Sequence, residues 1–212
     1  MHIDEFNQVR NSLLKAREER AYIQRDIILR NDMPLVCMSI VSPGPIKDSI
    51  CHRTALVLAL NQLECSFAEK NMHIKERYAR ISAAGPEVFL SIHGEPSHIK
   101  HICIETESRF SWGRLLDLDV YMLEKKPEGT EVVNIIRPLH REELGYPPRS
   151  CIVCGDPAFQ CMTERKHTLG ELLIASDALF KTIPHETTQI TALLPQWLEN
   201  DMQTKREMLY AF

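Results

Sequence analysis

Residues 113–123 constrain the fold of this chain most strongly, because apolar side chains recur there at every second position. Successive side chains of a β-strand point to opposite faces of the sheet, so this period predicts a strand with one face in the core. We assign the core face to Leu116, Leu118, Val120 and Met122. The opposite face then carries Leu115, Asp117, Asp119 and Tyr121. The chain is therefore expected to build a sheet around this strand.

Asp117 and Asp119 are predicted to project side by side from the strand. Aspartate is unfavourable inside a strand, and two ionised carboxylates this close repel each other unless a cation lies between them. Mg²⁺ is the simplest candidate, because it binds one or two carboxylates together with substrate phosphates. We interpret the pair as the metal site of a phosphoryl or nucleotidyl transfer centre. The alternative is the solvated outer face of an edge strand, since D-x-D also occurs by chance.

Composition and charge exclude several classes of protein. The 212 residues fit one domain, or one domain with a small appendage, and 44% hydrophobic residues are enough for a core. The net charge of −4 gives no basic field for nucleic acid. No apolar run is long enough to span a bilayer, and residues 1–5 do not resemble a signal peptide. We expect a cytoplasmic protein that binds neither nucleic acid nor membrane.

The remaining patterns place helices before and after a series of strands. Apolar side chains recur at helical spacing from about Asp4 to Arg30 and again after Ser49. Strands are predicted at 35–41, 72–83, 88–92, 98–105, 115–123 and 131–136, with a turn at 84–87, and later helices at 167–180 and about 188–210. This order predicts an α+β fold, a mainly antiparallel sheet flanked by helices. We expect residues 1–183 to form the domain and 184–212 a C-terminal helical extension.

The loop at 42–49 has two prolines and a glycine before a predicted helix. Asp48 or Ser49 can cap that helix, and its free N–H groups favour an anion. Gly44 and Lys47 are therefore candidate phosphate ligands, although the spacing is not that of a Walker A loop. The alternative is a rigid turn with a surface lysine.

Three cysteines and one histidine lie close together in the sequence after residue 150. Cys151-x-x-Cys154 is followed by Cys161 and His167, an order that resembles a zinc knuckle. A structural zinc would tie this loop down and contribute to folding. The alternatives are buried reduced thiols or a redox pair, because seven cysteines in a reducing compartment are expected to be thiols or metal ligands. The nearby Arg149, with Arg165 and Lys166, is either a phosphate-binding wall or ordinary surface charge.

Four segments in order carry a resemblance to a known family: Pro43–Ser49, Gly85–Glu87, Gly113–Val120, and Pro148–Cys151 with Cys154, Cys161 and His167. Together they resemble the citrate lyase holo-acyl-carrier-protein synthases, the apo-citrate lyase phosphoribosyl-dephospho-CoA transferases. The resemblance runs from the first helix to about Leu173. The tail after about Pro184 is longer than the family pattern predicts.

This resemblance implies a reaction. The family transfers a prosthetic group from triphosphoribosyl-dephospho-CoA to a serine of the apo acyl-carrier subunit of citrate lyase and releases diphosphate. It implies that Asp117 and Asp119 are catalytic and hold Mg²⁺. Phosphates would then be bound by Gly44, Lys47, Gly113, Arg114 and Arg149.

The implied chemistry also suggests a nucleotidyltransferase-like fold. That superfamily typically places a Gly-Ser pair and a helical turn before its two acidic residues, whereas here Gly113-Arg114 stands only a few residues before Asp117. Glu105 and Glu131 are both candidates for a third carboxylate.

Two other functions fit parts of the pattern. A D-x-D glycosyltransferase would bind a sugar nucleotide and need no carrier protein. A non-enzymatic zinc-binding interaction module would depend on Cys154 and not on Asp117.

Overall fold

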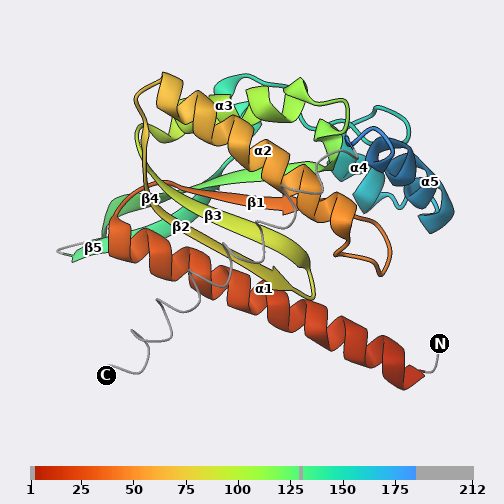
Figure 1. Ribbon diagram of the computed structural model, residues 1–212. Coiled ribbons are helices and arrows are strands. Elements are labelled where there is room, and N and C mark those ends of the chain that lie inside the picture. Colours follow the sequence, from red (N-terminus) through yellow and green to blue (C-terminus); the bar gives the residue numbers. More distant parts are fainter. Residues whose placement is uncertain (1–2, 129–130, 185–212) are drawn as a thin grey trace.

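The computed structural model describes residues 3–128 and 131–184, which form an α+β fold with one sheet between two layers of helices (Figure 1). The sheet has five strands in the order β2-β3-β1-β4-β5, and every neighbouring pair is antiparallel. The strands are β1 (Leu35–Ile40), β2 (His73–Ser82), β3 (Gly85–His93), β4 (Leu116–Glu128) and β5 (Glu131–Leu139). The predicted fold class is confirmed.

The helices divide between the two faces of this sheet. One face is crossed by α1 (Ile3–Asn31), and the other is covered by α2 (Ile50–Glu69) and α3 (Pro96–Arg109). The short helices α4 (Ala158–Thr163) and α5 (Leu169–Phe180) pack at one end, near the start of β4 (Figure 1). Two 3-10 turns, η1 (Gly113–Leu115) and η2 (Arg141–Leu144), precede β4 and follow β5. None of the described helices combines the length and apolar character needed to cross a bilayer.

Each face of the sheet has its own core. The larger core lies against α2 and α3 and includes Val36, Met38, Leu63, Leu90 and Leu118. The smaller core lies against α1 and consists of Ile27, Ile28, Leu35, Cys37 and Phe89. Because alternate residues of β1 enter different cores, this central strand is buried on both sides.

The alternation predicted for β4 is present in the structure. Leu116, Leu118 and Val120 are buried in the larger core, and Asp117 and Asp119 point toward the α1 side. Pairing with β1 places Asp117 opposite Ser39 and Asp119 opposite Cys37. β4 lies between β1 and β5 in the sheet, but β5 pairs with it only from Val120 onward, so the two aspartates lie on a part of β4 that has a strand on one side only.

Leu115 was predicted on the aspartate face, and this prediction is wrong. The residue lies in η1, before the strand begins, and is fully buried in the larger core. The alternation therefore starts one residue later than the sequence pattern indicates.

The predicted strand at 98–105 is also wrong, because these residues belong to α3. Pro96 stands in the first turn, where a proline suits a helix. Ile99, Ile102 and Cys103 are fully buried and follow the spacing of one helical face. The same residues also allow an alternating interpretation, which led to the wrong element.

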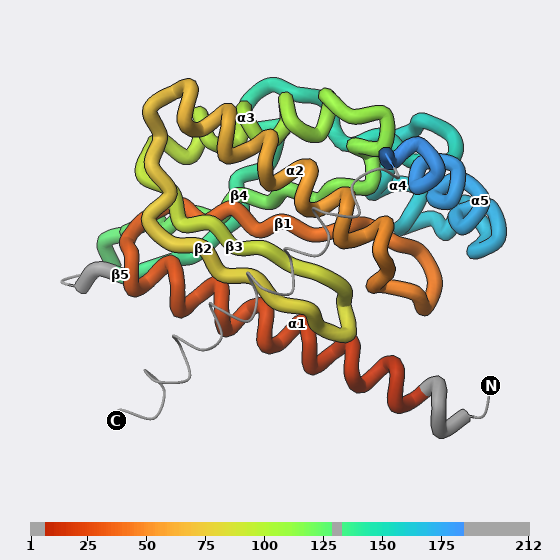
Figure 2. Tube along the Cα trace, viewed as in Figure 1, coloured from red at the N-terminus to blue at the C-terminus, as the bar shows by residue number. Residues whose placement is uncertain are grey.

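The β2–β3 hairpin is tighter than predicted. Gly85, Pro86 and Glu87 belong to β3, and only Ala83 and Ala84 form the loop. The hairpin tip lies beside the loop that follows β1 (Figure 2), where a Cβ on Gly85 would lie 2.3 Å from the Lys47 carbonyl oxygen. Gly85 has φ +102°, so this position excludes side chains both sterically and conformationally. The helix predicted at 188–210 lies outside the described residues.

Candidate functional site

The start of β4 carries the two carboxylates that the sequence predicts to be catalytic. Burial and the neighbouring Asp117 charge together raise the pKa of Asp119 to about 6. Lys100 and Arg149 oppose this shift but do not cancel it. The pair is therefore held close together at an electrostatic cost, which a bound cation would remove.

Arg149 is the cation that contacts this pair directly. Its Nη1 donates to Asp117 Oδ1 over 2.7 Å, and its Nη2 donates to the Leu116 carbonyl oxygen. The contact is possible because β5 begins pairing with β4 only at Val120, so the edge of β4 before that residue has no strand beside it. The same edge receives the Glu107 carboxylate, which accepts from the Leu118 N–H over 3.2 Å. Side chains thus replace a strand along the part of β4 that carries the carboxylates.

A buried ion network lies on the α1 side of the pair. The Glu87 carboxylate accepts from Arg20 of α1 and from Arg80 of β2, the latter over 2.7 Å. Arg20 and Glu87, with Cys37, Ser39 and Asp119, line a small cavity between α1 and the sheet. Arg20 therefore ties α1 to the sheet beside Asp119 and places a positive charge near it.

The loop after β1 reaches the same end of the sheet. The Val41 N–H donates to the Leu115 carbonyl oxygen over 2.7 Å, which brings the start of the loop next to β4. Gly44 has φ +76°, and a Cβ there would lie 3.1 Å from a methyl group of Leu173 on α5. Ser49 caps α2, accepting from the His52 N–H over 3.4 Å, as predicted.

Lys47 is half-buried in this loop. Its ammonium donates to the Ser42 carbonyl oxygen, so one of its three protons is used within the loop. Burial, with a smaller contribution from Arg17, lowers its pKa. Phosphate binding by Gly44 and Lys47 stays a prediction.

Arg114 and Gly113 lie in η1 immediately before β4. Arg114 is half-buried, and within 3–128 and 131–184 its side chain has no hydrogen-bond or ion-pair partner. Burial and the nearby Arg149 lower its pKa, and the charge of Glu107 opposes this shift without cancelling it. Gly113 packs against the Glu107 carbonyl oxygen, which a Cβ would approach to 1.8 Å, so packing alone requires glycine there.

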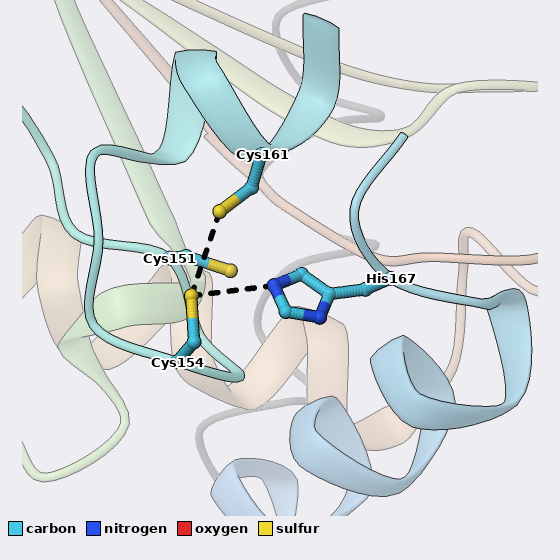
Figure 3. A group of neighbouring side chains, drawn as sticks. All are labelled: Cys151, Cys154, Cys161 and His167. Carbon is cyan, nitrogen blue, oxygen red and sulfur yellow. Dashed lines mark hydrogen bonds between the residues drawn. The ribbon is translucent and has the colours of Figure 1, made fainter. Parts of the chain in front are cut away.

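The predicted Cys/His group also comes together (Figure 3). One ligand atom each from Cys151, Cys154, Cys161 and His167 lies within 4.8 Å of all the others. Cys154 Sγ is 3.5 Å from Cys161 Sγ and 3.3 Å from His167 Nε2. Cys154 is exposed, so these residues are not simply buried thiols. Lys166 pairs with Asp156 over 2.5 Å and so has a partner within the same segment.

Comparison with known proteins gives one consistent answer. The profile of the family described as apo-citrate lyase phosphoribosyl-dephospho-CoA transferase matches residues 8–182. The chain is 36% identical over 171 residues to the protein of that name from Escherichia coli O139:H28, covering 81% of this chain and 87% of that protein. Proteins of the same name from E. coli O7:K1 and Shigella boydii serotype 18 are 35% and 36% identical over the same shares.

The chain belongs to the apo-citrate lyase phosphoribosyl-dephospho-CoA transferase family. The resemblance drawn from four segments of sequence is therefore confirmed. Membership in this family does not favour the glycosyltransferase or the non-enzymatic zinc module.

In this member of the transferase family, the structure unites Asp117 and Asp119 with Arg149 and brings Arg114 close to Arg149. Sequence reasoning missed Glu87, Glu107 and Arg20, which surround the pair. Glu87 belongs to Gly85–Glu87, one of the four segments that carry the family resemblance, and this was the one feature of the sequence that could have identified it as a site residue.

Neither candidate for a third carboxylate lies beside the pair. Glu105 is exposed on α3, and Glu131 pairs with Glu128 at the far end of the β4–β5 hairpin. Glu107, whose charge acts on Asp119, is closer to the pair than either of them.

Proposed function

We propose that this protein transfers the phosphoribosyl-dephospho-CoA group from triphosphoribosyl-dephospho-CoA to a serine of the apo acyl-carrier subunit of citrate lyase, in the cytoplasm. The observation that carries this proposal is the family match over residues 8–182. The carboxylates and arginines at one end of the sheet supply a site for such chemistry.

The proposed reaction is a nucleotidyl-type transfer. The serine oxygen attacks the α-phosphorus, a new P–O bond forms, and the bond to the departing diphosphate breaks while the serine proton is released. Negative charge increases on the leaving oxygens, so catalysis requires preorganised positive charge rather than covalent participation of the protein. We also propose that the α+β fold of this chain is of the nucleotidyltransferase type.

The residues of the pair fit a divalent cation. Asp117 and Asp119 share one face of β4, where burial and the neighbouring charge of Asp117 raise the pKa of Asp119, so a cation between the two carboxylates would be favourable. Oxygen ligands of this kind, with room left for substrate phosphates, suit Mg²⁺. When held by these two carboxylates, the ion would supply positive charge to the phosphate oxygens.

The surrounding cations then have separate roles. Arg149 orients Asp117 through its 2.7 Å contact and places a positive charge beside that carboxylate. Arg114 has no partner among the residues that the structure describes, so its guanidinium is available to the triphosphate. Lys47 keeps two donors beyond its bond to Ser42 and can serve the same anion.

A mass measurement tests the proposal. The protein is incubated with purified apo acyl-carrier subunit, triphosphoribosyl-dephospho-CoA and Mg²⁺, and the intact mass of the carrier is followed. We expect the carrier to gain one phosphoribosyl-dephospho-CoA group, and a carrier with its acceptor serine replaced by alanine to gain none. No mass increase with active, folded protein would contradict the proposed function, and transfer from a sugar nucleotide instead would favour the glycosyltransferase.

A further inference from the structure

The four Cys/His ligand atoms lie within 4.8 Å of one another, and two of their separations are close to the edges of a tetrahedral metal site. Zinc lies about 2.3 Å from sulfur and about 2.0–2.1 Å from nitrogen, so the edges of its ligand tetrahedron are about 3.8 Å between sulfurs and about 3.5 Å between sulfur and nitrogen. The Cys154–Cys161 and Cys154–His167 separations are 3.5 and 3.3 Å. A disulfide would need about 2.05 Å between its sulfurs, so the cluster has the geometry of metal ligands rather than of a bonded pair.

The backbone around these ligands turns sharply so that the side chains converge. The Val153 N–H donates to Cys151 Sγ over 3.4 Å, which fixes the direction of this side chain. The Gly155 N–H donates to the Cys151 carbonyl oxygen over 3.2 Å, with φ +81° at Gly155. Arg165 has φ +49° and turns the chain back toward His167. These two short turns therefore bring Cys151 and Cys154 close to Cys161 and His167.

Apolar packing does not explain why this segment holds its shape. Every residue from 151 to 167 is described, and Cys151 and Cys161 are the buried ones among them. The largest apolar side chains of the segment, Phe159 and Met162, are 62% and 76% exposed. α4 has only six residues, which is too short to be stable alone. Hydrogen bonds and the Lys166–Asp156 ion pair join parts of the segment, and a metal ion would add the cross-link that apolar packing does not supply.

We infer that Cys151, Cys154, Cys161 and His167 bind one structural zinc ion. Three thiolates and one imidazole are a closed ligand set that Zn²⁺ binds in tetrahedral geometry. Binding forms three Zn–S bonds and one Zn–N bond, and thiols that were protonated release their protons to solvent. No position is left for a substrate, so this ion stabilises the segment and takes no part in the transfer.

The zinc also connects two parts of the proposed reaction site. Arg149, which contacts Asp117, precedes the first ligand by two residues, and its carbonyl oxygen accepts from the Ala158 N–H over 2.7 Å. His167 precedes α5, whose Leu173 packs against Gly44. The ion therefore fixes both the arginine and the helix that supports the loop after β1. The functional meaning of this link rests on the proposed transfer, whereas zinc binding itself does not.

Metal content tests zinc binding without any substrate. The full-length protein, purified with reductant and without chelator, is expected to hold about one zinc per chain. Replacement by Co²⁺ should give the charge-transfer and visible bands of a tetrahedral thiolate site. Cys154→Ser should lose most of the metal, whereas Cys65→Ser, which removes an exposed thiol from α2, should keep it. His167→Cys preserves four ligands and should also keep zinc.

Hydrogen exchange tests what the ion holds in place. Removing zinc should accelerate exchange at the amides of Cys151 and Ala158, which donate to Asp156 and Arg149. Amides of β4 that bond to β1 should be unaffected, because the sheet does not depend on the ion. Unchanged exchange after zinc removal would overturn the structural role and leave zinc binding intact.

Two results would overturn zinc binding. The first is wild-type protein with no bound metal and no cobalt spectrum, even after refolding with zinc. The second is a Cys154–Cys161 disulfide in protein purified without reductant, together with no metal after reduction. Loss of transfer with normal zinc content would instead count against the proposed function alone.

Discussion

The carboxylate pair on β4 and the Cys/His cluster lie near each other but are held in place by different means. β4 pairs with β1 along the whole stretch that carries Asp117 and Asp119, and Leu118, the residue between them, is buried in the larger core. The cluster stands on turns and a six-residue helix whose apolar side chains are exposed. The sheet can therefore hold two carboxylates close together although their charges repel. The Cys/His segment has no comparable scaffold, and in our proposal it is held by the bound zinc.

Removing one carboxylate of the rigid site should have the largest effect. Asp117→Asn keeps an oxygen that can accept from Arg149 but loses the charge, and removal of one preorganised electrostatic group typically costs about 3–4 kcal/mol of barrier. We expect the transfer rate to fall by about two to three powers of ten, measured from carrier mass at saturating substrates. Asp32→Asn, at an exposed position that pairs with Lys125, is the control and should transfer normally.

The second prediction concerns what the sheet does to Asp119. Its pKa is about 6 in the folded protein, against 3.8 for an ordinary aspartate, so the folded state binds more protons between these values. Stability from this group is present below pH 4 and is lost as pH rises through about 6, by up to about 3 kcal/mol. In buffer without Mg²⁺, Asp119→Asn should therefore gain stability relative to wild type from pH 4 to pH 7.5.

Denaturant unfolding at several pH values measures this effect. The difference in the free energy of unfolding between Asp119→Asn and wild type should change with pH. A constant difference for Asp119→Asn would show that the sheet does not hold the two charges at a cost.

The smallest effect is expected in the loop after β1. A charge-assisted contact contributes about 1.5–3 kcal/mol, so Lys47→Ala should weaken binding of the triphosphate precursor by about tenfold to a hundredfold. Affinity for the carrier should change little, because the carrier is recognised by a protein surface. Calorimetric titration of the precursor measures the first and titration of the carrier the second.

Lys75→Ala, on an exposed position of β2, is the matched control for Lys47→Ala. Unchanged precursor affinity in Lys47→Ala, with weaker binding in Arg114→Ala, would move the phosphate site to Arg114 and Arg149. The loop would then be a rigid turn that packs against Gly85 and α5.

The two regions also differ from the rest of the molecule in how much the sequence reveals. Alternation placed Asp117 and Asp119 on one face of a strand, and close spacing predicted the Cys/His group, because both signals are local. The same alternation misassigned 98–105, where the residues fit both a strand and the buried face of α3.

Contacts between distant segments were not predictable from one sequence. The bond between Arg149 and Asp117 joins residues 32 positions apart, and Arg20 and Glu87 are 67 apart. Their pairing depends on the order of strands and on where β5 begins, which no local pattern encodes.

The response of thermal stability to Mg²⁺ tests most directly whether the carboxylate pair holds a divalent cation. A ligand at ten times its dissociation constant stabilises the folded state by about 1.4 kcal/mol, so millimolar Mg²⁺ at pH 7.5 should raise the melting temperature of the wild type in a saturable way. Asp119→Asn should show little of this increase, whereas Asp32→Asn and His167→Cys should show all of it. An equal increase in Asp119→Asn, or none in the wild type, would contradict a metal site at Asp117 and Asp119.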